Sequence, residues 1–369
     1  MTLLVVVVLA LGVFLGLRQS RVRTTAISQP LDRPAGHPKL PAPSIPQYHQ
    51  TESDPAPPPS RIRKMLTGEE LPEIRPEQLE EYLASNHRNA ASLIAAFRLT
   101  GDRRFFDEAV EKAPNDPRVA CASWFRTQDK VERQKWLEKW EKADPRNALA
   151  SYLAAANLFK SGMNDAALGQ LEAVGDKTEF SYFARESILD CEEAYEAAGY
   201  SETEAKMAAT MGLLLPHLVE LKGLSQNLAD LALAYRDAGD EASAQAALNI
   251  GFQMTRRIAA GPSCLIEDLV ALAAENNLLK GMDPNSPTGT PGKTVQDLQN
   301  ETKERREALK TAGKASEAIL QTLGEADLGG YCDRVQLFGE RAAMDWLKEK
   351  FGSPQDSSAP TDGLKARLH

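Results

Sequence analysis

Residues 286–294 end in Gly292-Lys293-Thr294, the three residue types that close a phosphate-binding loop. Such a loop also needs a glycine five positions before Gly292, so that backbone N–H groups can surround the phosphates. Pro287 occupies that position, and the sequence predicts no strand before it. A nucleotide site is therefore not expected here.

Histidines and acids give no further catalytic pattern. Of the five histidines, two fall in a proline-rich segment and one ends the chain, so neither a metal cluster nor a general base is predicted. The motifs HExxH, GxSxG and SxxK do not occur. We interpret the acids at 190, 192 and 193 as a solvated helix face, and Asn300-Glu301-Thr302 fits a glycosylation acceptor only in a eukaryotic secretory setting. The histidines are His37, His49, His87, His217 and His369.

Cysteines and tryptophans are interpreted as core residues. The four cysteines lie about 70 residues apart with no CxxC pair, which favours small buried side chains over a disulfide or a metal site. Trp136 and Trp140 are four residues apart, so they share one helix face and are expected, with Trp124, to pack in the core. If that face were exposed, it would become a partner site.

Composition favours an all-α protein, because alanine, leucine, glutamate and lysine dominate and aromatic residues make up only 6%. The net charge of −9 argues against nucleic-acid binding, since affinity for phosphate backbones comes largely from clustered Lys and Arg. We therefore expect no nucleic acid, no cofactor and no metal among the ligands of this protein.

The apolar run over residues 3–17 is followed by Arg18, Arg21 and Arg23. It would reach about 23 Å of a hydrocarbon core of roughly 30 Å. A basic n-region and an A-x-A-like cleavage site are missing, so residues 1–23 predict an uncleaved single-pass membrane anchor, with a cleaved signal peptide and a buried helix as alternatives. Positive charges after the run favour a cytoplasmic body, and basic residues upstream would reverse that orientation, which leaves the side open.

Residues 24–60 contain ten prolines between positions 30 and 59 and predict a disordered linker. A helical body is expected over 61–282, a loop over 283–293, C-terminal helices over 294–352 and a disordered tail over 353–369. Helices are expected at 295–309 and 316–323, and one last amphipathic helix at 330–352. The apolar stripe of that last helix comprises Val335, Phe338, Ala342, Trp346 and Leu347.

The clearest helix pair spans residues 218–257. Its first half places leucines and one tyrosine three or four residues apart, and Gly239 and Asp240 then supply a helix end and a new N-cap. Similar pairs break at Gly101 and Gly162. Over roughly residues 76–280 these units resemble the tetratricopeptide repeat family. The residues that carry the resemblance are Leu228, Leu231, Ala232, Tyr235, Gly239, Ala244, Leu248 and Gly251, then Ala154, Ala155, Leu158, Gly162, Ala167, Leu171 and Val174, then Phe97, Gly101, Phe106, Ala109 and Pro114.

The resemblance implies a solenoid of antiparallel helix hairpins whose first helices line a groove for peptides or partner helices. Ala91, Tyr152 and Ala229 stand where family members that clamp a C-terminal carboxylate carry lysine or asparagine, which argues against that mode of binding. The helices between the units would be divergent repeats or insertions. The groove residues that the resemblance implies are Arg88, Arg98, Tyr152, Phe159, Gln226 and Arg236.

The sequence thus predicts a membrane-tethered helical-repeat protein that acts as a non-catalytic protein–protein interaction scaffold. Two alternatives stay open. One is an enzyme or enzyme subunit on a helical scaffold, whose acidic residues converge only in three dimensions. The other is a spacer or assembly factor that self-associates through its C-terminal helices.

Overall fold

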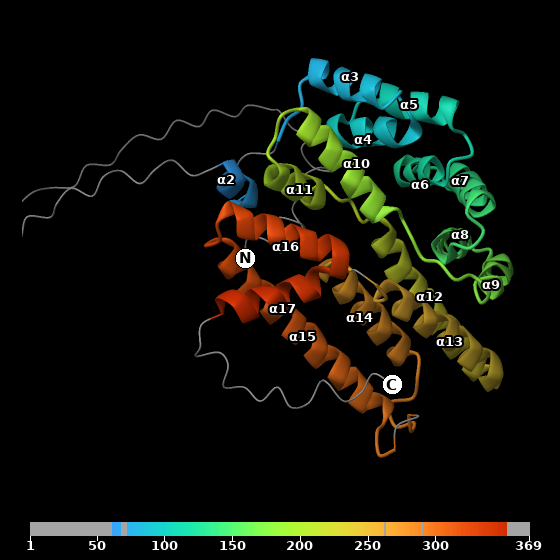
Figure 1. Cartoon of the computed structure of the whole chain (residues 1–369). Helices are drawn as coiled ribbons and strands as arrows, with labels where there is room; N and C mark the ends of the chain where they lie inside the picture. The colour runs from blue at the N-terminus through green and yellow to red at the C-terminus, as the bar shows by residue number, and fades with distance from the viewer. Residues whose placement is uncertain (1–60, 68–71, 262, 289–290, 353–369) are drawn as a thin grey trace, which may run out of the picture. The chain divides into compact units, whose positions relative to one another are not determined.

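A computed structural model of the chain describes residues 61–67, 72–261, 263–288 and 291–352, and these residues form sixteen helices and no strand (Figure 1). Helix α2 (Arg61–Thr67) belongs to a unit that ends at Glu70, and the other helices belong to the unit that begins at Leu71. The predicted anchor at 3–17, the linker at 24–60 and the tail at 353–369 lie outside the described residues. Among the described helices, none combines the length and apolar character needed to cross a bilayer.

The expectation of an all-helical, solenoid-like architecture is confirmed in the larger unit. Side chains of Asp or Asn accept backbone N–H groups at the start of α4 to α8 and of α13, so local sequence sets many helix starts. The bounds are α3 (Pro76–Ser85), α4 (Ala90–Thr100), α5 (Arg103–Lys112), α6 (Pro117–Arg126), α7 (Lys130–Ala143), α8 (Ala148–Lys160), α9 (Asn164–Glu172), α10 (Ala184–Ala197), α11 (Glu202–Met211), α12 (His217–Asp237), α13 (Glu241–Ile258), α14 (Leu265–Lys280), α15 (Val295–Leu320), α16 (Glu325–Phe338) and α17 (Glu340–Phe351).

Consecutive helices pack as pairs, and the pairs pack on one another. Helix α4 contacts α5, α6 contacts α7, α8 contacts α9, α12 contacts α13, and α14 contacts α15. Helix α8 then packs on both α7 and α12, and α12 packs on α14. Gly251 in α13 allows one of these close approaches, because a Cβ there would overlap the side chain of Leu278. The array therefore continues from the α8–α9 pair to the α12–α13 pair through the contact of α8 with α12.

Helices α10 and α11 leave this array. They pack on each other, but α10 also packs on α3 and α4, and α11 packs on α16 (Figure 1). Ile188, Cys191 and Ala194 of α10 share a buried cluster with residues of α3 to α6. Lys206 of α11 pairs with Asp333 of α16 at 2.7 Å. This hairpin joins the first helices of the unit to the last ones.

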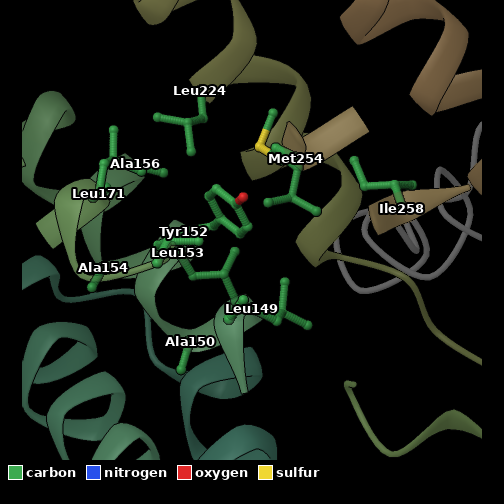
Figure 2. Packing of buried hydrophobic residues seen from close by; sticks show 14 of the residues in the cluster. Leu149, Ala150, Tyr152, Leu153, Ala154, Ala156, Leu171, Leu224, Met254 and Ile258 are labelled. Atoms are coloured by element: carbon green, nitrogen blue, oxygen red, sulfur yellow. The ribbon is translucent and has the colours of Figure 1, made fainter. Parts of the chain in front are cut away.

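A second buried cluster centres on α8. Figure 2 shows the Tyr152 ring among Leu149, Leu153, Leu224 and Met254, which come from α8, α12 and α13. Trp124 and Trp140 lie in the same cluster with at most 1% of their surface exposed, which confirms the prediction of core packing for both, and Trp136 packs against it partly buried. The four cysteines are free thiols, and three of them are buried.

Two expectations for the C-terminal helices are wrong. Instead of separate helices at 295–309 and 316–323, α15 runs without a break through Gly313, where a Cβ would overlap Leu265 of α14. Instead of one helix at 330–352, α16 and α17 meet at Gly339, whose φ of +86° reverses the chain. The predicted stripe is divided accordingly, with Leu347 buried and Phe338 65% exposed.

Candidate functional site

A groove of about 590 Å3 runs along α14, which packs against α13 on one side and α15 on the other. Its α13 wall carries Gln245, Phe252, Arg256 and Ala259. Phe252 and Ala259 follow Gln245 at intervals of seven residues, and Arg256 lies one turn after Phe252, so these side chains share one helix face. The wall spans about 14 residues and is therefore about 20 Å long.

The groove residues on α14, which forms the floor, and on α15, which forms the opposite wall, also share one face of each helix. On α14, Asp268, Leu272, Glu275 and Leu279 are spaced by three or four residues, and on α15 Leu298 and Arg305 are seven apart. Helix α15 runs antiparallel to α14, because Gln299 donates to the Leu279 carbonyl at 3.1 Å while Arg305 bonds Glu275 near the middle of α14. Three helix faces from separate stretches of sequence therefore form one groove.

One half of the groove is apolar. Phe252 of α13, Leu279 of α14 and Leu298 of α15 meet there, and Met282 and Pro287 complete that end. Leu279 is almost fully buried, whereas Phe252, Met282 and Leu298 are half-buried and Pro287 is exposed. Half-buried apolar side chains on an open groove lose their remaining contact with water when a partner covers them, which favours binding.

The other half carries charge. Arg305 bonds both carboxylate oxygens of Glu275 at 2.9 Å, and Arg341 of α17 pairs with Asp268 at 2.9 Å. The Arg256 side chain is exposed and makes no hydrogen bond or ion pair with any other residue that the structure describes. The groove thus holds three guanidinium groups against two carboxylates, and one of the cations has no partner within the described part of the chain.

Two further acids lie next to this charged end, behind the groove. Glu267 accepts the Cys264 backbone N–H at 2.9 Å and the Tyr182 hydroxyl. Glu340 accepts the Leu265 backbone N–H at 2.6 Å and the Tyr331 hydroxyl at 3.4 Å.

Burial raises the pKa of both carboxyl groups, and their hydrogen bonds from backbone N–H groups oppose that rise. Each acid caps the start of α14, so each is explained by structure alone. The two acids hold the N-terminal end of the groove floor in place.

The groove offers apolar and charged binding contacts. None of the described residues that line it is a histidine or a cysteine. Across the described part of the chain, no group of three or more His, Cys, Asp and Glu side chains could hold a metal ion. Apolar surface next to arginine suits recognition of a peptide or protein segment.

Arg88 and Arg98, two of the residues implied by the resemblance, lie at the α3 to α5 end of the unit. Arg88 lies in the turn between α3 and α4 and donates to Glu80 at 2.6 Å. It also donates to both carboxylate oxygens of Glu108 at 2.5 and 2.8 Å, which connects this turn to α5. Arg98 is half-buried on α4 and faces α10, where its charge acts on the Asp190 carboxyl. Burial raises the pKa of Asp190, and the neighbouring arginines oppose that rise.

Tyr152 and Phe159 both belong to the core around α8. Tyr152 has no exposed surface, and burial raises the pKa of its phenol to about 12. Phe159 is half-buried and packs against the same cluster. Tyr152 therefore offers no contact surface to a partner, because its position in the centre of the cluster is covered by α12 and α13.

Gln226 and Arg236 lie on α12. Gln226 is exposed and donates to Asp230 at 2.8 Å. Arg236 bonds Glu241 at 2.9 Å and the Gly281 carbonyl at 2.6 Å, so it joins the ends of α12, α13 and α14. None of the six predicted residues lines the groove along α14, and the structure does not gather them at one surface.

Sequence reasoning missed Phe252, Arg256 and Arg305. Each belongs to an ordinary amphipathic helix, and nothing in the local pattern tells which two helices will flank α14. The heptad spacing of Gln245, Phe252 and Ala259 was the available signal, because a stripe with that spacing suits a packed neighbouring helix.

Comparisons of the chain with protein-family models, with curated proteins and with solved structures gave no match.

Proposed function

We propose that this protein is a membrane-tethered, tetratricopeptide-like scaffold that binds a segment of a partner protein in the groove between α13 and α15, without catalysis. The observation that carries the proposal is the groove itself, which combines half-buried apolar residues with Arg256, an arginine that no other described residue pairs with. The apolar run over residues 3–17 supports attachment to a bilayer.

The groove along α14 replaces the groove that the resemblance implies. A partner on the α4 face would compete with α10, which buries Ile188, Cys191 and Ala194 in the same cluster as α4. A partner on the α8 face would compete with α12 and α13, which cover Tyr152. The α13 to α15 groove has no helix of the described residues laid along it.

A groove-filling substitution tests this proposal. Ala259 lines the groove and is the exposed C-terminal cap of α13, with φ −87° and ψ −2°. Ala238 is the exposed cap of α12, with nearly the same angles of −79° and −3°, and it does not line the groove. Ala259→Trp should therefore fill the groove, while Ala238→Trp should add the same side chain elsewhere.

Proximity labelling with the intact chain in its native cells provides the measurement, with circular dichroism as the check on folding. We expect the Ala259→Trp chain to lose specific labelled proteins that the wild-type and Ala238→Trp chains retain. If all three folded chains label the same proteins, the groove is not the binding site.

A further inference from the structure

We infer that the groove recognises an amphipathic helix of a partner protein that carries an acidic side chain one turn from an apolar side chain. This inference rests on the proposed function and names its partner class. It follows from Arg256, whose side chain has no ion-pair partner among the described residues, and from the helical spacing of the α13 wall.

The charge of the groove differs from that of the whole chain. The protein carries a net charge of −9, yet the groove holds Arg256, Arg305 and Arg341 against Asp268 and Glu275. Glu275 and Asp268 each have an arginine partner, so Arg256 alone has none among the described residues. A carboxylate that arrived with the partner would give Arg256 its ion pair, and such pairs select partners more than they add affinity.

The spacing of the groove residues along α13 indicates the shape of the partner. Gln245, Phe252 and Ala259 repeat every seven residues on α13, and Thr255 fills the intermediate position of the same stripe. Phe252 and Ala259 are the apolar members of this stripe, and Arg256 falls on its flank, where charged residues in packed helices pair with the facing helix. A partner helix laid on this stripe therefore places an acidic residue opposite Arg256 and an apolar residue against Phe252.

The floor of the groove disfavours other anionic partners. Asp268 and Glu275 both lie beneath the groove, so a phosphate chain or a lipid headgroup would meet carboxylates as well as arginines. The half-buried side chains of Phe252 and Leu298 would also stay uncovered by a purely polar ligand. An amphipathic helix can cover the apolar half of the groove and also pair with the arginine in its charged half.

Three fluorescein-labelled helical peptides test the inference on the full-length chain in detergent. The first has a leucine stripe flanked by glutamates, the second has the glutamates replaced by lysines, and the third has the leucines replaced by serines. The protein variants are Arg256→Glu and, as a matched control, Arg185→Glu on α10, where the arginine is also exposed and unpaired among the described residues.

We expect the glutamate peptide to bind the wild type and the Arg185→Glu control equally, and to bind Arg256→Glu at least about tenfold more weakly. The lysine peptide should prefer Arg256→Glu over the wild type, and the serine peptide should bind none of the proteins. Equal binding of the glutamate and lysine peptides to the wild type would overturn the charge inference, and failure of all three peptides would overturn the helix inference.

The Ala259→Trp chain separates these failures from failure of the proposed function. If Ala259→Trp blocks a peptide whose binding does not depend on charge, the groove is the binding site, but the inference of an acidic partner is wrong. If the glutamate peptide binds Ala259→Trp and the wild type equally, the groove itself is the wrong site.

Discussion

Tyr152 and His217 show at the level of single residues how burial changes chemistry in this protein. His217 has no exposed surface, packs against Tyr182 with ring centroids 4.1 Å apart, and finds no hydrogen-bond partner for either ring nitrogen among the described residues. Burial lowers the pKa of His217 to about 3. Tyr152 was predicted to line a groove and His217 was given no role, and both are core residues in the structure.

His217 should make the protein less stable in acid. In the unfolded chain the imidazole takes up a proton below pH 6.5, whereas in the folded protein it stays neutral down to about pH 3. The folded pKa is the lower one, so this group should make the free energy of unfolding fall as pH drops from 6.5 towards 3. His217→Phe should remove this contribution and keep the ring contacts with Tyr182.

Urea unfolding between pH 7 and pH 4 would measure the effect. His87→Asn is the matched control, because His87 is exposed and its positive φ of 54° is one that asparagine tolerates. A wild-type pH dependence that persists unchanged in His217→Phe would show that this ring is not the cause.

Periodicity predicted which side chains are apolar partners within a helix, and it could not predict what covers them. Trp124 and Trp140 were correctly placed in the core, because large aromatic side chains at helical spacing need burial. Tyr152 was placed on a groove by the family resemblance, yet α12 and α13 cover it. The covering helices lie about 70 and 100 residues further along the chain, so no local pattern encodes this contact.

At the level of elements, two glycines in similar sequence surroundings have opposite roles. Gly313 continues α15, whereas Gly339 ends α16 and begins α17. A glycine inside a helix costs only about 1 kcal/mol relative to alanine, so helical periodicity can run through either position. Tertiary packing decides between them, since Gly313 lets α14 approach closely and Gly339 adopts φ +86° and ψ 163°.

Gly339→Ala should destabilise the protein by about 1–3 kcal/mol, because the conformation at this position is nearly exclusive to glycine. Gly324→Ala is the control, since Gly324 also precedes a helix but has φ −76°, and a Cβ there would meet no atom within 4 Å. Thermal unfolding of both variants would test the prediction. Equal midpoints for the two variants would argue against a required turn at Gly339.

At the level of the whole molecule, the helix-pair scheme was predictable and the path of the chain between pairs was not. The glycine breaks at 101, 162 and 239 lie between paired helices, as the sequence predicted. The departure of α10 and α11 from the array depends on contacts with α3, α4 and α16, which are remote in sequence. The groove along α14 was unpredictable for the same reason, because α13, α14, α15 and α17 all contribute to it.

Binding through the groove along α14 can be tested most directly by photo-crosslinking in the native cells, with a benzophenone amino acid placed in the intact chain. One position is Ala259, on the α13 wall of the groove, and the other is Gln226, exposed on α12 outside it. We expect a partner protein to be crosslinked from position 259 and not from position 226. Crosslinking from position 226 alone would place the partner on α12 and contradict binding in the groove.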